Sequence, residues 1–106
     1  MSKVPQITPA EARDLLAGDG NALLLDVREE WEYERAHVEG SRLIPMGDVP
    51  ARVDELNPEQ TIVVLCHHGN RSQHVAMWLQ SRGFSVNNVA GGIDAWAALD
   101  PALPRY

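Results

Sequence analysis

The sequence contains very little cysteine and lysine, and each shortage excludes a class of protein. Cys66 is the single cysteine among 106 residues, so an intramolecular disulfide and a thiolate-rich zinc site are both excluded. Lys3 is the single lysine, and nine basic residues against fifteen acidic residues give a net charge of −6. Because no basic cluster is present, we expect no nucleic-acid partner.

Long apolar runs are missing as well. The longest, Ala22–Leu25 and Ile62–Cys66, are far too short to cross a bilayer, so we expect no membrane partner. The first residues, MSKVPQITPAEARDLL, lack the apolar centre of a secretory signal, which favours a cytoplasmic protein. A hydrophobic fraction of 44% is typical of a globular chain, and 106 residues are enough for one domain, which we expect to span residues 1–106.

Short helices alternate with short apolar strands along the chain. Thr8, Pro9 and Glu11 predict a helix start with a capping box, and this helix should run to about Ala17, before a turn over 18–21. Strands are expected at 22–27, 38–44, 61–66 and 84–89. Further helices are expected at 48–56, 72–82 and 93–99, with a loop and a short helical piece over 28–37.

This alternation predicts an α/β fold, in which a small, mostly parallel sheet is flanked by helices on both faces. The segment Thr61–Cys66 is apolar and β-branched, so it should be the central strand. Ligands of such sheets bind beyond the carboxyl ends of the strands. Cys66 lies at such an end.

The segment from residue 66 to residue 72 reads Cys-His-His-Gly-Asn-Arg-Ser, and its composition predicts a site for an anionic sulfur. Backbone N–H groups of a tight loop, together with the start of the next helix, favour a thiolate over a thiol. Gly69 permits unusual dihedral angles, Ser72 is a natural N-cap, and Arg71 adds a positive charge. Cys66 is therefore a candidate nucleophile, although a lone cysteine is more often a small buried hydrophobe.

With these features, the sequence resembles the single-domain rhodanese family, from about Thr8 to Leu99. The segment 66–72 is similar to the family's active-site loop, and Leu25-Asp26-Val27-Arg28 is similar to its early strand. The segment His37-Val38-Glu39-Gly40-Ser41 resembles its "HIxGA" motif, with Val for Ile and Ser for Ala. The segment Gly91-Gly92-Ile93-Asp94-Ala95-Trp96 resembles its "GGxxxW" motif.

The resemblance implies a sulfurtransferase that needs neither a cofactor nor a metal. Its catalytic residue would be Cys66, which takes a sulfur atom from a small anionic donor such as thiosulfate and holds it as a persulfide. Cyanide, a thiol or a sulfur-accepting protein would then receive that sulfur. The remaining loop residues would bind the substrate: His67, His68, Gly69, Asn70, Arg71 and Ser72.

Two other functions stay open. One is a non-catalytic rhodanese-like module that binds a protein partner, although the intact Cys66, Gly69 and Arg71 disfavour it. The other is a phosphatase or arsenate reductase that uses the same thiolate. Related phosphatases have five residues between Cys and Arg, whereas this loop has the four residues of a C-x4-R pattern, and the tighter ring favours sulfur over phosphate. A persulfide donor is an alternative to thiosulfate.

Several polar residues near the loop allow two interpretations. His67 and His68 either donate to substrate oxygens, more strongly when protonated, or are solvated loop side chains. Arg71 either faces the substrate or braces loop carbonyls. A metal site made of Cys66, His67, His68 and His74 is disfavoured, because the spacing fits no tetrahedral pattern.

Residues farther from the loop are expected to be structural. Asp26 and Arg28 should support the scaffold, and His37 should pack with its polar atoms satisfied. The tryptophans should belong to the core or its rim, although Trp31 could form a wall of the site. The glutamates at 29, 30, 32 and 34 should form a solvated acidic face, or less simply a docking surface.

Overall fold

The computed structural model describes residues 3–18 and 21–104. The predicted α/β fold is confirmed: five strands form a single sheet in the order β1-β5-β4-β2-β3, and every pairing between neighbours is parallel. The strands are β1 (Gln6–Ile7), β2 (Ala22–Asp26), β3 (Arg42–Leu43), β4 (Thr61–Leu65) and β5 (Ser85–Val89). As predicted, β4 is central. From Thr61 onward, its residues pair one to one with successive residues of β2 and of β5.

The helices are α1 (Pro9–Leu16), α2 (Glu30–Arg35), α3 (Val49–Arg52), α4 (Asn70–Ser81) and α5 (Gly92–Ala97). Apart from α3, they start and end close to where the local sequence signals them. The capping box predicted for α1 is present, since the Thr8 hydroxyl accepts from the Glu11 amide and the Glu11 carboxylate accepts from the Thr8 amide. The turn expected over 18–21 includes Asp19 and Gly20, which lie outside the described residues.

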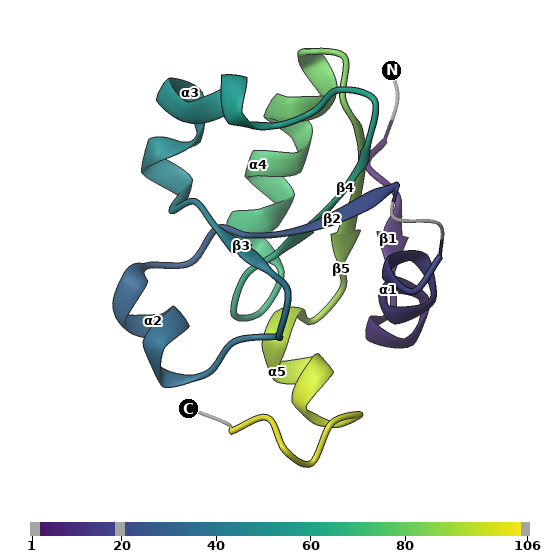
Figure 1. The fold of residues 1–106 in the computed structure, drawn as a ribbon, viewed down its shortest axis with the longest axis vertical. Helices are drawn as coiled ribbons and strands as arrows, with labels where there is room; N and C mark the ends of the chain where they lie inside the picture. Colours follow the sequence, from purple (N-terminus) through teal and green to yellow (C-terminus); the bar gives the residue numbers. More distant parts are fainter. Residues whose placement is uncertain (1–2, 19–20, 105–106) are drawn as a thin grey trace.

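The helices cover both faces of the sheet, as Figure 1 shows for α4 and α1 on opposite sides of the strands. Successive β4 residues point to opposite faces: Ile62 and Val64 join the core beneath α3 and α4, whereas Val63 and Leu65 join the core beneath α1 and α5. All four of these side chains are completely buried. The strand that ends at Cys66 is therefore held from both sides.

Two local expectations were wrong: the strand expected at 38–44 is reduced to the two residues of β3, and the helix expected over 48–56 is interrupted. The segment predicted as one helix over 48–56 is a 3₁₀ turn (Met46–Asp48), the four-residue α3 and a second 3₁₀ turn (Val53–Glu55), and the Asp48 side chain does not cap. On α4, the apolar Met77 is 54% exposed, because it faces away from the sheet. The sequence also gave no signal for β1, whose two residues are too few to show periodicity.

Among residues 3–18 and 21–104, no helix is long and apolar enough to cross a bilayer.

Candidate active site

Cys66 lies directly after β4, at the carboxyl end of the central strand. Its side chain is 1% exposed, and the chain bends over the next three residues before α4 begins. The backbone N–H of Gly69 donates a hydrogen bond to the Cys66 Sγ over 3.0 Å. Gly69 has a φ of 103° and is the N-cap residue of α4, a conformation that glycine adopts without strain. The expected amide contact to the sulfur is thus present in the structure.

A buried polar network from β5 supports the other side of the sulfur. The Ser72 Oγ lies 3.3 Å from Cys66 Sγ and also donates to the Asn88 Oδ1 over 2.5 Å. The Asn88 Nδ2 donates in turn to the Gly69 carbonyl over 3.2 Å and to the Gln6 side chain over 2.9 Å. Asn88 thereby ties the loop to β5 and orients the two groups that contact the sulfur.

The role of Ser72 differs from the one predicted. Because Gly69 is the N-cap residue, α4 begins at Asn70, two residues earlier than expected. Ser72 therefore lies in the first turn of the helix, completely buried, and its hydroxyl faces Cys66 and Asn88 instead of capping the helix. Asn70 is exposed at the start of the helix and helps to line a polar hollow of about 380 Å³ beside the loop.

The start of α5 holds the backbone of the loop. The amide of Ile93 donates to the Cys66 carbonyl over 2.8 Å, and the amide of Asp94 donates to the His67 carbonyl over 3.1 Å. Gly92 makes this approach feasible, because a Cβ at that position would lie 2.4 Å from both carbonyl oxygens. The peptide bonds here are trans, so the amides of His67 and His68 point away from α5.

Arg71 forms an ion pair with Glu32 of α2. Its two terminal guanidinium nitrogens lie 2.5 and 2.8 Å from the carboxylate oxygens. Glu32 is 3% exposed, and its carboxylate is buried against the Arg71 guanidinium. The expectation of a solvated face for the glutamates at 29, 30, 32 and 34 is therefore wrong for Glu32. In this pair, Arg71 braces α4 against α2 by way of the Glu32 carboxylate. A contact between Arg71 and the substrate stays a prediction.

His67 and His68 follow the nucleophile, and their rings stack on each other with centroids 4.0 Å apart. Burial of the His67 ring lowers its pKa from the usual range, and the neighbouring His68 adds to this effect. Anion binding by a protonated His67 would therefore require a lower pH than the sequence suggested. Whether either ring contacts a substrate stays a prediction.

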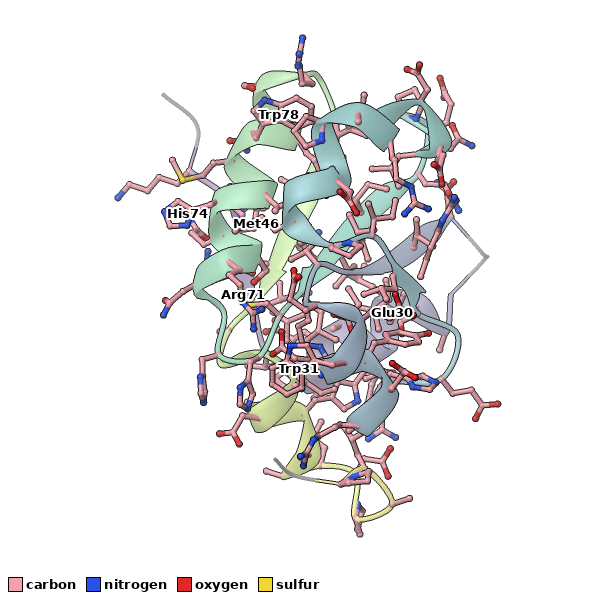
Figure 2. All side chains as sticks on the ribbon, turned by 90° about the vertical axis from the view of Figure 1, so that its left-hand side faces the viewer. Glu30, Trp31, Met46, Arg71, His74 and Trp78 are labelled. Carbon is pink, nitrogen blue, oxygen red and sulfur yellow. The ribbon has the colours of Figure 1, made fainter. Side chains whose placement is uncertain are left out.

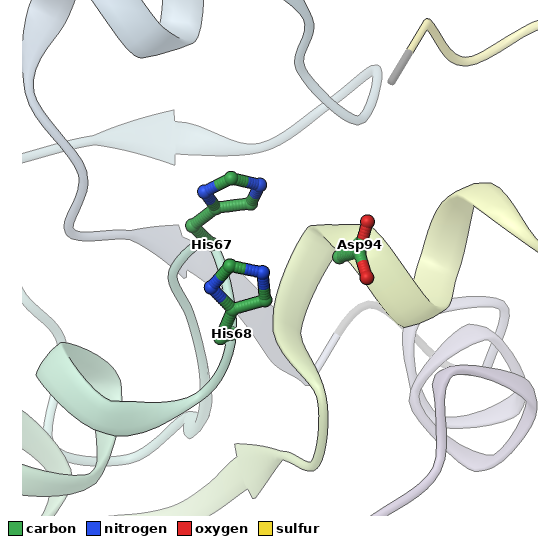
Figure 3. Close-up of side chains that lie close together, drawn as sticks. All are labelled: His67, His68 and Asp94. Carbon is green, nitrogen blue, oxygen red and sulfur yellow. The ribbon is translucent and has the colours of Figure 1, made fainter. Parts of the chain in front are cut away.

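The arrangement of possible metal ligands differs from the set weighed in the sequence. Among the described residues, one group brings three potential ligands together: His67, His68 and Asp94 (Figure 3). Neither Cys66 nor His74 belongs to it. Asp94 comes from α5, which the sequence alone does not place beside the loop.

Other residues singled out in the sequence are structural. Asp26 and Arg28 form a completely buried ion pair, and the Arg28 guanidinium also donates to the carbonyls of Glu32 and Ala36, which confirms their scaffold role. The His37 Nδ1 donates to the Tyr33 carbonyl over 2.9 Å, and the ring stacks on that of Tyr33, although His37 is exposed.

The three tryptophans have different environments. Trp96 is a core residue at 2% exposure, and Trp78 is partly buried against the core beneath α4. Trp31 is 58% exposed on α2 and shares one face of the molecule with Arg71 on α4 (Figure 2). The core assignment is thus wrong for Trp31, and its alternative role as a wall of the site stays a prediction.

Asn88 and Glu32 belong to the site but were missed in the sequence. A weak signal existed for Asn88, because Asn87-Asn88 places two consecutive polar residues in a strand, so one of them faces a core, and a buried polar side chain requires partners. No comparable signal distinguished Glu32 from the other three glutamates around it.

Comparison with known proteins identifies the family of the chain. The model of the rhodanese-like domain family matches residues 8–99. The chain belongs to this family. A solved rhodanese-like domain protein from Staphylococcus aureus superposes with a TM-score of 0.85 at 28% identity, covering 97% of this chain and 99% of that one.

Two curated relatives are informative. The thiosulfate sulfurtransferase GlpE of Pseudomonas putida (strain GB-1) is 34% identical over 103 residues, which cover 96% of this chain and 93% of GlpE. YrkF of Bacillus subtilis is 38% identical over 96 residues, or 90% of this chain. The chain spans about half of YrkF, 52% of its length.

Proposed function

We propose that this rhodanese-family chain is a sulfurtransferase that carries a sulfane sulfur on Cys66. The observation that supports the proposal most directly is the hydrogen bond from the Gly69 amide to the Cys66 Sγ, within a C-x4-R loop at the start of a helix. An oriented amide and a helix N-terminus stabilise negative charge on sulfur before and after the transfer. The relationship to GlpE, a thiosulfate sulfurtransferase by name, agrees with this chemistry.

The reaction consists of two displacements at sulfur. The Cys66 thiolate attacks the outer sulfur of thiosulfate, the sulfur–sulfur bond of thiosulfate breaks, and sulfite leaves with the bonding electron pair. Cys66 then holds a persulfide. Cyanide or a thiolate attacks its outer sulfur, forming thiocyanate or a new persulfide, and the electron pair returns to Cys66.

The burial of Cys66 restricts the donor. Because its side chain is 1% exposed, a donor must present a terminal sulfur that enters the loop, and the outer sulfur of thiosulfate or of a small persulfide meets this requirement. The acceptor must approach the outer persulfide sulfur in the same way, so a small nucleophile or the exposed thiol of a partner protein is suitable.

Steady-state kinetics test the proposal. Thiocyanate formation from thiosulfate and cyanide should give parallel lines in double-reciprocal plots, because the two substrates react in separate half-reactions. Cys66→Ser should form no thiocyanate while keeping the circular dichroism spectrum of the unaltered protein. Thiocyanate formation by Cys66→Ser at the unaltered rate would contradict the proposal. A folded protein that forms no thiocyanate but hydrolyses an aryl phosphate would favour the phosphatase alternative.

A further inference from the structure

We propose that His67, His68 and Asp94 form a binding site for a divalent transition metal of the zinc type. One potential ligand atom from each of these side chains lies within 4.8 Å of the other two, and Figure 3 shows the paired imidazoles beside the carboxylate of α5. None of the three carries a step of the sulfur chemistry proposed above.

The shape of the loop brings the two imidazoles together. Consecutive side chains of an extended strand point in opposite directions. His67 and His68 lie instead in the bend after β4, and their rings are stacked with an angle of 21° between the planes. Both imidazoles are therefore presented on one side of the loop, as two ligands to one ion require.

Backbone contacts place Asp94 beside the two histidines. The amide of Asp94 donates to the carbonyl of His67 over 3.1 Å, so two of the three ligand residues are joined directly by a hydrogen bond. The adjacent Ile93 amide binds the Cys66 carbonyl, and Gly92 allows the two segments to pack closely. The positions of the ligand backbones are thus set by the fold, and only side-chain rotation is needed to complete the site.

The donor set suits zinc and its neighbours in the first transition series. Imidazole nitrogens and a carboxylate oxygen bind Zn²⁺ at about 2.0–2.2 Å, commonly with three protein ligands and one open position. His68 is exposed and Asp94 is partly exposed, so both have room to rotate inward. The positive charge of Arg71, in the first turn of α4, is neutralised by the Glu32 carboxylate, so it does not oppose a metal ion nearby. The net charge of −6 also favours the binding of a cation.

Calorimetric titration of Cys66→Ser with Zn²⁺, in a buffer that does not chelate metals, tests the site. This variant removes the thiol as a competing ligand, and we expect one equivalent of Zn²⁺ to bind. In the same background, His67→Ala and Asp94→Asn should each weaken binding at least about tenfold, since even outer-sphere partners of a metal contribute about that much. Co²⁺ should show visible absorption typical of nitrogen and oxygen ligation.

His74→Ala in the same background is the matched control, because His74 is an exposed histidine outside the group, and its affinity for Zn²⁺ should be unchanged. In Cys66→Ser itself, Zn²⁺ should also shift the NMR signals of His67, His68 and Asp94. This measurement does not depend on the folding of any further variant. Absence of binding, or equal weakening by His74→Ala and Asp94→Asn, would overturn the proposal. Because these experiments use a chain without the thiol, their failure is separate from failure of the sulfurtransferase proposal.

Discussion

The carboxylate of Glu32 and the guanidinium of Arg71 are joined by two hydrogen bonds, although the residues are 39 positions apart in the sequence. Glu32 lies on α2 and Arg71 lies in the first turn of α4. Their contact therefore holds the segment after β2 against the loop that follows Cys66. The pair links the scaffold to the proposed catalytic loop.

Glu32→Gln should lower the free energy of unfolding by about 2 kcal/mol, between the values typical of exposed and of buried ion pairs, because Glu32 is buried and Arg71 is partly exposed. Glutamine keeps an oxygen that can accept from the Glu29 amide, as the Glu32 carboxylate does, so the change removes the charge and leaves this hydrogen bond in place. Urea denaturation measures the effect. The control is Glu30→Gln, an exposed neighbour on the same helix. Equal losses in both variants would show that the pair contributes nothing.

Gly92→Ala should disrupt the loop, because its Cβ would lie 2.4 Å from the carbonyl oxygens of Cys66 and His67. We expect a loss of at least about 3 kcal/mol in stability from steric overlap and backbone strain together, with sulfur transfer abolished. Gly83→Ala is a close control: its φ of +93° is also positive, against +61° at Gly92, but no atom lies within 4 Å of the added Cβ. Its cost should be about 1–2 kcal/mol. Similar thermal denaturation curves for the two variants would contradict the close approach.

The His67 imidazole should titrate below the usual histidine pKa of about 6.5, because burial of the ring and the adjacent His68 disfavour its protonated form. The unfolded chain then binds this proton more readily than the folded protein. Between the lowered pKa and about 6.5, stability should consequently increase as the pH rises. Nitrogen-detected NMR of the imidazoles in metal-free buffer measures the pKa. Asp94→Asn should lower it further, because the Asp94 charge acts in the opposite direction. A midpoint at or above the usual value would contradict this explanation.

The sequence was informative for the central strand and for the loop that follows it, where residues adjacent in the chain determine the structure. The apolar, β-branched run before Cys66 predicted the central strand, and the loop that follows it predicted a helix start close to the sulfur. These predictions held because strand burial and glycine conformation depend on residues that are adjacent in the chain.

The rest of the site depends on contacts between distant segments. Glu32 is buried because α4 brings Arg71 to it, and Asn88 belongs to the site because β5 pairs with β4. Asp94 meets His67 only after α5 packs against the loop. Single-sequence patterns contain no such distances, so they predict a solvated acidic run that includes Glu32.

Intact-mass spectrometry after incubation with thiosulfate tests the central claim most directly, namely that Cys66 accepts and holds a sulfur atom beside the Gly69 amide. The account predicts that the protein gains the mass of one sulfur atom, that cyanide removes it, and that Cys66→Ser gains nothing. An unchanged mass in the unaltered protein, or the same gain in Cys66→Ser, would contradict it.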